Sequence, residues 1–179
     1  MKNKNEILKK IKNIKLFISD IDGVLTRGEI IILNSGEEVK IWNVKDGLGY
    51  TFLRDIYPKV KTAWITGRGS LQVQERAKSM KIDYLIKDCM TKKEAFDKLL
   101  LKTGFKPEET VYIGDDIVDI AVLKAAGFSV CPKDAVESVK KYVDYVSRFN
   151  GGEGAVREII DLILEAKGEM KNICGKYGK

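Results

Sequence analysis

Histidine is absent from the 179-residue chain. This excludes catalysis by Ser-His-Asp or Cys-His groups, zinc sites held by histidine, and acid–base chemistry by imidazole. If the protein is an enzyme, carboxylates, lysine and an oxygen-bound metal ion must carry its chemistry.

Cysteine is scarce, and the three residues Cys89, Cys131 and Cys174 lie far apart. An odd number at this spacing matches neither a disulfide framework nor a zinc site. Long apolar runs are also absent, and the first residues lack the apolar core and cleavage site of a signal peptide. We therefore expect a cytoplasmic protein with free thiols and no membrane partner.

Much of the net charge of +6 comes from lysines in residues 1–15 and after residue 166. Basic ends can bind nucleic acid or a membrane surface. Here no aromatic residues are interleaved with these lysines to form a stacking platform for nucleic acid. We interpret both ends as solvated surfaces, with residues 168–179 as a basic tail, and expect no nucleic-acid partner.

Strand-like and helix-like segments alternate along the chain. Strands are predicted at residues 16–19, 61–65, 83–86, 110–113, 128–131 and 143–146. Helices are predicted at residues 5–12, 46–55, 71–80, 92–102, 117–126, 135–142 and 155–167, with Ser70 and Thr91 as N-caps and Gly104 as a C-terminal stop. The alternation predicts an α/β fold, a doubly wound parallel sheet covered on both faces, with residues 1–179 as a single domain.

One connection departs from this pattern. The first strand-to-helix connection of such a fold usually has about 2–6 residues, but helix-like sequence begins only near residue 46. Residues 29–33 and 39–42 resemble strands and residues 34–37 a turn, which predicts a β-hairpin insertion over residues 29–43. A lone hairpin is marginal in water. Because its first arm is apolar on both faces, another subunit is a candidate for its packing partner.

Two carboxylates, Asp20 and Asp22, follow the first predicted strand in the segment FISDIDGV. Residues two apart on a strand point to the same face, and ligands bind at the carboxyl ends of the strands in open α/β sheets. The structural alternative is a strand that ends in an Asx-type turn.

More polar residues occupy equivalent places after other strands or at a helix start. They are Thr66, Lys92, Asp115, Asp116 and Asp119. We expect them to converge at one sheet edge, where several carboxylates require a cation such as Mg²⁺. Lys92 and Thr66 suit the site to a dianionic phosphate. One carboxylate can act as nucleophile, giving an aspartyl phosphate, while its neighbour transfers protons.

These segments, in this order and spacing, resemble the four motifs of the haloacid dehalogenase superfamily of phosphatases over residues 16–154. The resemblance implies the Rossmann-like fold of that superfamily and Mg²⁺ as cofactor. By motif it implies that Asp20 is the nucleophile and a metal ligand, and that Asp22 is the general acid/base with its backbone carbonyl on the metal. It further implies Asp115 as the third metal ligand, Thr66 and Lys92 as phosphoryl-binding residues, and Asp116 and Asp119 as residues that orient Lys92 or metal-bound water.

A narrower resemblance is to the capless subfamily of 3-deoxy-D-manno-octulosonate 8-phosphate phosphatases, through DGVLT at 22–26, DGLG at 46–49, TGR at 66–68 and GGEGAVRE at 151–158. It implies hydrolysis of a small phosphorylated sugar acid. It also implies a homotetramer assembled partly through the hairpins, in which the glycine-rich segment helps to close a neighbour's site. The implied substrate-binding residues are Gly67, Arg68, Gly151, Gly152 and Gly154. The glycines can allow close approach to substrate or simply form a flexible turn.

Two arginines bear on specificity. Arg27 stands where the family usually has aspartate, so an extra cation either changes substrate preference or faces solvent. Arg68 suits a second anion such as a sugar carboxylate, or it pairs locally at a helix start. The branch that acts on nine-carbon, sialic-acid-like phosphates often has an acidic residue there. Arg68 therefore favours the octulosonate.

Three alternatives remain at this point. One is a phosphatase for a nine-carbon sugar-acid phosphate. Another is a non-catalytic subunit on the same fold, because fold alone does not give function. The last is a receiver domain of two-component signalling, which also gathers carboxylates around Mg²⁺. A receiver is shorter, lacks the hairpin, and carries its phospho-acceptor on a middle strand.

Overall fold

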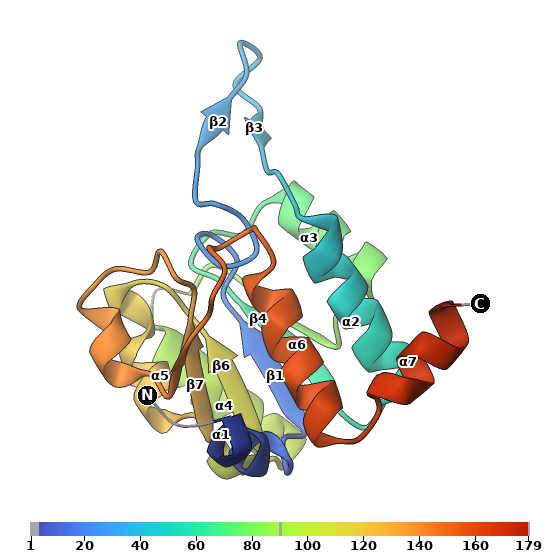
Figure 1. Cartoon of the computed structure of the whole chain (residues 1–179). Helices are drawn as coiled ribbons and strands as arrows, with labels where there is room; N and C mark the ends of the chain where they lie inside the picture. Colours follow the sequence, from blue (N-terminus) through green and yellow to red (C-terminus); the bar gives the residue numbers. More distant parts are fainter. Residues whose placement is uncertain (1–3, 90, 179) are drawn as a thin grey trace.

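A computed structural model describes residues 4–89 and 91–178. In this part of the chain six strands form one parallel sheet, in the order β5-β4-β1-β6-β7-β8 (Figure 1). Their bounds are β1 Leu16–Ser19, β4 Lys61–Ile65, β5 Tyr84–Ile86, β6 Thr110–Ile113, β7 Phe128–Cys131 and β8 Tyr145–Val146. The central strand β1 pairs with both β4 and β6, so the three strands that precede motif residues are neighbours.

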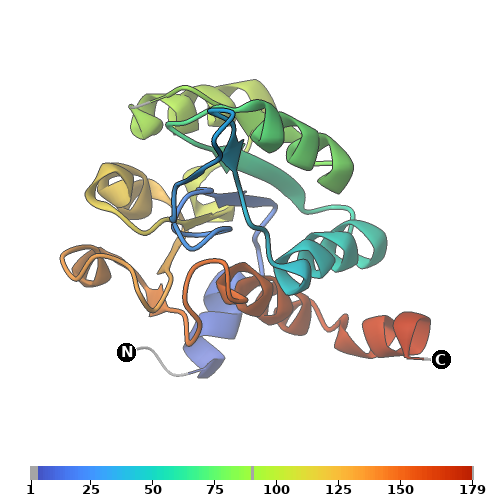
Figure 2. The ribbon, with the colours of Figure 1, turned by 90° about the horizontal axis from the view of Figure 1, so that it is seen from above.

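Two apolar cores cover the faces of the sheet. One contains side chains of α1 (Lys4–Ile11), α2 (Val44–Ile56), α3 (Leu71–Met80), α6 (Ala155–Ala166) and α7 (Met170–Tyr177). The other contains side chains of α4 (Lys92–Thr103), α5 (Ile120–Ala125) and the 3₁₀ turn η3 (Val139–Tyr142). Successive strand residues alternate between the cores, with Phe17 in the first and Leu16 and Ile18 in the second. Figure 2 shows α6 and α4 on opposite sides of the sheet. The predicted doubly wound fold is confirmed.

Several predicted elements differ in detail. Helix α2 begins at Val44, because the Asn43 side chain caps it by accepting from the Lys45 amide. Residues 135–142 form only the short turn η3, and residues 117–126 form η2 (Ile117–Asp119) followed by α5. A further 3₁₀ turn, η1, spans Pro107–Glu109. Ser70 caps α3 as predicted, whereas Thr91 makes no side-chain cap to α4.

The hairpin projects beyond the carboxyl edge of the sheet (Figure 1). Its paired segments are short, β2 Ile31–Ile32 against β3 Glu38–Val39. Its first arm is apolar and open, with Ile30 59% and Ile32 67% exposed. Large exposed apolar side chains in a row are characteristic of an interaction surface.

Both basic ends of the described chain form helices that pack on the first core, α1 and α7. The sequence had predicted a solvated basic tail at residues 168–179 and not a helix. Ile7 and Ile11 of α1 and Ile173 of α7 are buried in the first core. Lys10 forms a 2.5 Å ion pair with Asp144. None of the helices in the described ranges has the length and apolarity needed to cross a membrane.

Candidate active site

Asp20 lies immediately after β1. Its amide continues the sheet ladder by donating to the Ile113 carbonyl at 2.9 Å. Its Oδ1 accepts from the Ile21 amide at 2.7 Å, and only 6% of the residue is exposed. The rigid strand therefore fixes this carboxylate at the sheet edge.

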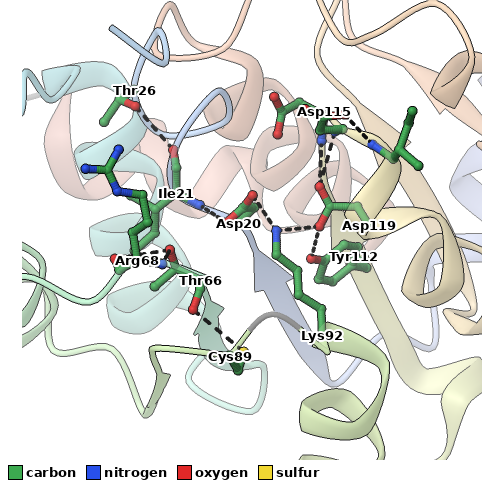
Figure 3. A network of polar contacts seen from close by, with 12 residues as sticks. Asp20, Ile21, Thr26, Thr66, Arg68, Cys89, Lys92, Tyr112, Asp115 and Asp119 are labelled. Atoms are coloured by element: carbon green, nitrogen blue, oxygen red, sulfur yellow. Dashed lines mark hydrogen bonds and ion pairs between the residues drawn. The ribbon is translucent and has the colours of Figure 1, made fainter. Parts of the chain in front are cut away.

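Lys92 opens α4 and lies between two carboxylates (Figure 3). Its Nζ is 2.6 Å from Asp20 Oδ2 and 2.7 Å from Asp119 Oδ1, and all three residues are buried. The Tyr112 hydroxyl donates to Asp119 at 2.5 Å, and the amides of Asp115 and Asp116 donate to Asp119 Oδ2 at 3.1 and 3.3 Å. Asp119 is thus saturated with donors and acts as the anchor for Lys92.

The charges of this cluster are poorly solvated. Burial, with repulsion from Asp119, raises the pKa of Asp20 to about 7 despite the opposing effect of Lys92. Burial, with repulsion from Asp20 and Asp119, raises the pKa of Asp115 to about 8. Burial lowers the pKa of Lys92, but attraction to Asp20 and Asp119 outweighs it and leaves that pKa above its ordinary value. The site therefore has an excess of negative charge that one lysine does not neutralise.

Asp20, Asp115 and Asp119 each offer an oxygen, and these oxygens lie within 4.8 Å of one another. Asp115 accepts no side-chain hydrogen bond from the described residues, unlike the saturated Asp119. A Cβ on Gly23 would lie 2.1 Å from Asp115 Oδ2, so the glycine leaves room for this carboxylate. An all-oxygen set with excess negative charge suits a hard divalent cation such as Mg²⁺.

Thr66 and Arg68 follow β4. Thr66 is 1% exposed, and its Oγ1 accepts from the Arg68 amide at 3.2 Å. The Arg68 guanidinium extends to the hairpin, where its Nη2 donates to Glu38 Oε2 at 2.7 Å. Thr66 is therefore held at the base of the site, and Arg68 at its rim.

A cavity of about 360 Å³ joins these groups. Its lining includes most of the predicted site residues, namely Asp20, Asp22, Thr66, Gly67, Arg68, Lys92, Asp115 and Asp116. Arg27 and Cys89 also line it. Within the described residues, the hydrogen bonds and ion pairs of the Lys92 ammonium go to Asp20 and Asp119 and not to Asp116. Asp116 Oδ1 caps η2 by accepting from the Ile117 amide at 2.5 Å. A pocket that combines a buried carboxylate, cations and a hydroxyl can bind and cleave a phosphate ester.

Comparison with known proteins agrees with this geometry. Residues 61–160 match the family model of haloacid dehalogenase-like hydrolases. The 3-deoxy-D-manno-octulosonate 8-phosphate phosphatase of Escherichia coli K12 is 39% identical over 171 residues, which cover 96% of this chain and 90% of that protein. The chain belongs to this phosphatase family.

Solved structures of the octulosonate phosphatase family match the fold closely. The Moraxella catarrhalis phosphatase, in complex with magnesium ion, phosphate ion and a KDO molecule, has a TM-score of 0.93 and 38% identity, covering 97% of this chain and 98% of that one. The cobalt-bound phosphatase of Haemophilus influenzae has a TM-score of 0.85 and 39% identity, covering 89% and 92%. The sheet, the hairpin and the absence of a cap domain in the described residues therefore agree with one family.

The glycine-rich segment of this family member packs against its own chain. The Gly152 amide donates to the Val24 carbonyl at 2.9 Å, and the Gly151 amide to Asp134 Oδ1 at 2.8 Å. A Cβ on Gly151 would lie 1.9 Å from the Gly23 carbonyl oxygen. None of the three glycines lines the cavity. Within one chain Gly151 and Gly152 support the loop after Asp20, and contact of Gly151, Gly152 and Gly154 with substrate stays a prediction.

Sequence reasoning missed several residues of this octulosonate-phosphatase site. Tyr112 lies inside a predicted strand, where its only signal was that a buried tyrosine hydroxyl needs a partner. Lys40 and Glu38 stand two apart on the hairpin, so both project from one face. Lys40 contacts Asp22 and Glu38 contacts Arg68. Their charge pattern was available in the sequence, but their long-range partners were not.

Proposed function

We propose that the chain is a Mg²⁺-dependent phosphatase that converts 3-deoxy-D-manno-octulosonate 8-phosphate to 3-deoxy-D-manno-octulosonate and phosphate. The buried Asp20–Lys92–Asp119 contact beside Asp115 carries the proposal for the reaction. The octulosonate specificity is supported by curated relatives of that name at 39% identity, which match along 96% of the chain.

In the proposed mechanism, an Asp20 carboxylate oxygen attacks phosphorus and the bond to the sugar oxygen breaks. Asp22 gives its proton to that leaving oxygen, so the sugar departs as an alcohol. Asp22 then takes a proton from water as the water attacks phosphorus. The bond between phosphorus and the Asp20 oxygen breaks, which releases phosphate and restores the carboxylate.

Other residues hold the phosphoryl group and offset its charge. Lys92 lies against Asp20, where negative charge concentrates, and Thr66 offers a hydroxyl at the base of the cavity. Mg²⁺, held by Asp20, Asp115 and the backbone carbonyl of Asp22, would supply further charge neutralisation. Asp119 fixes Lys92, and Asp116 shapes the adjoining turn.

The rim supports a substrate that carries a second anion. Arg68 and Arg27 are both more than half exposed and both line the cavity. Arg68 can pair bidentately with a sugar carboxylate. Gly67 and the segment with Gly151, Gly152 and Gly154 are proposed to allow close approach of the sugar. Arg27 gives this chain an additional cation, which can shift preference toward another sugar acid, including the nine-carbon type.

We further propose that one domain carries the activity, that the protein works in the cytoplasm, and that it assembles as a homotetramer. The exposed apolar arm around Ile30 and Ile32 supports assembly. The free cysteines agree with a reducing compartment.

Phosphate release in Mg²⁺ from a panel of sugar phosphates tests the function, with Asp20→Asn as control. The panel contains the octulosonate 8-phosphate, nine-carbon sugar-acid phosphates and hexose phosphates. We expect the octulosonate to have the highest kcat/KM, and Asp20→Asn and EDTA each to stop turnover while the fold survives. Preference for a nine-carbon acid would keep the mechanism and correct the substrate. Turnover of no compound would support a non-catalytic subunit.

A further inference from the structure

Lys40 directly follows β3 of the hairpin, and only 5% of its side chain is exposed. Its Nζ donates a hydrogen bond to Oδ1 of Asp22 in the loop after β1. Within the described chain no hydrogen bond reaches Oδ2 of Asp22. A buried ammonium group requires a partner. The Lys40–Asp22 contact should therefore fix the position of the Asp22 carboxylate better than an ion pair between two mobile surface side chains would.

The hairpin also contacts Arg68, at the rim of the cavity. Lys40 Nζ lies 3.3 Å from Glu38 Oε1, and Glu38 Oε2 accepts from Arg68 Nη2 at 2.7 Å. Charges therefore alternate along Asp22, Lys40, Glu38 and Arg68. The inserted hairpin reaches both an expected proton-transfer residue and an expected sugar-binding residue.

We propose that Lys40 is a positioning residue for the reaction. It holds the Asp22 carboxylate by Oδ1 and leaves Oδ2 to exchange a proton with the leaving oxygen of the phosphate ester. This inference rests on the proposed acid–base role of Asp22. It assigns the hairpin a part in the chemistry of its own chain, in addition to any part in assembly.

The physical reason is geometric. Proton transfer requires heavy atoms about 2.6–3.2 Å apart, and a well-placed acid contributes about 10²–10⁴-fold to the rate. Asp22 lies at the cavity rim with 32% of its side chain exposed, so without Lys40 it would occupy several rotamers. The loss in the first step should depend on the leaving group, because a sugar alkoxide needs a proton whereas 4-nitrophenolate leaves readily without one.

Steady-state kinetics in Mg²⁺ test the proposal on the octulosonate 8-phosphate and on 4-nitrophenyl phosphate. Lys40→Met removes the amine and keeps most of the side-chain length, Lys40→Arg keeps a charged donor, and Lys45→Met on an exposed position nearby is the matched control. We expect Lys40→Met to lower kcat/KM on the sugar phosphate roughly 10–100-fold, and on the aryl phosphate less than about threefold. The parameter kcat/KM reports the step in which the leaving group departs, whereas kcat also contains hydrolysis of the aspartyl phosphate, in which Asp22 serves both substrates. Lys40→Arg should recover most of the loss, and Lys45→Met should behave as wild type.

An equal loss of kcat/KM on both substrates, or no loss on either, would overturn the role of Lys40. Asp22→Asn is run beside it and should show the same dependence on the leaving group, with a larger loss. If Asp22→Asn lacks that dependence, the acid–base assignment and the Lys40 role both fail, while phosphatase activity and Asp20 stand. Lys40→Gln repeats the test if methionine prevents folding, and its loss must be equally selective for the sugar phosphate.

Discussion

Lys92 Nζ lies 2.6 Å from Asp20 Oδ2, and both side chains are withdrawn from solvent. The lysine comes from the start of α4 and the aspartate from the end of β1. Their contact joins the central strand to the helix layer on one face of the sheet. It also places a positive charge beside the proposed nucleophile, so one contact serves both stability and chemistry.

Lys92→Met should destabilise the protein and abolish turnover. Without the ammonium, Asp20 and Asp119 are left as buried carboxylates with no cation, which typically costs about 3–5 kcal/mol. Urea unfolding at pH 8 in EDTA measures this free energy. The matched control is Lys93→Met, because Lys93 forms an exposed pair with Asp97 that contributes less than about 1 kcal/mol. Equal effects of the two substitutions would contradict the assigned role of the buried pair.

The metal-free protein should become less stable as pH rises from about 5 to 8. The folded-state pKa is about 7 for Asp20 and about 8 for Asp115, above the ordinary value of 3.8. In this range the folded state keeps protons that the unfolded chain has released, so the free energy of unfolding falls by about 1 kcal/mol per pH unit for each such group.

Thermal unfolding at several pH values, with EDTA or with Mg²⁺, checks this dependence. Mg²⁺ stabilises the ionised carboxylates and should flatten the pH profile. Asp115→Asn should reduce the slope in EDTA. Stability that is constant or rises between pH 5 and 8 in EDTA would refute the prediction.

Gly151→Ala should lower both stability and kcat. The added methyl group would lie 1.9 Å from the Gly23 carbonyl oxygen, so the backbone after Asp20 must move. A substitution that strains backbone in this way typically costs about 1–3 kcal/mol. Gly175→Ala on α7 is the matched control, since nothing lies within 4 Å of its added methyl. It should raise stability slightly, because alanine favours a helix by up to about 1 kcal/mol over glycine.

Ile32→Lys should weaken the proposed assembly. Ile32 is 67% exposed on the hairpin, and a charge there is costly to bury between subunits. Sedimentation velocity should show a lower oligomer for this variant. Leu101→Lys, at an 85% exposed apolar position on α4, should leave the sedimentation coefficient unchanged. A monomeric parent protein would remove the basis of the assembly proposal.

The sequence was sufficient to predict those site residues that follow strands. Asp20, Thr66 and Asp115 each follow a strand, and neighbouring parallel strands bring such positions together in any doubly wound sheet. The alternation of strand-like and helix-like segments was sufficient to predict the fold class. The register of β1 between β4 and β6 agrees with the predicted convergence.

What the sequence did not reveal depends on three-dimensional packing. The salt bridge of Lys40 with Asp22 crosses from the hairpin to the first loop, and no local pattern specifies that distance. Residues 135–142 carry helix-like sequence, yet only a single 3₁₀ turn forms at Val139–Tyr142. Tertiary context overrides such weak local preferences. The helix α7 was missed because its lysines obscured the apolar residues that anchor it, the buried Ile173 and the partly buried Met170.

The hairpin combines two roles, since its first arm is apolar and open while Lys40 and Glu38 of its second arm contact Asp22 and Arg68, which line the cavity. If neighbouring copies of the chain pack against the first arm, they also restrict the motion of the second arm, which pairs with it. Specific activity would then depend on protein concentration. It would fall when dilution dissociates the subunits, and it would recover when the protein is concentrated again. The turnover rate of such an enzyme would therefore depend on its oligomeric state.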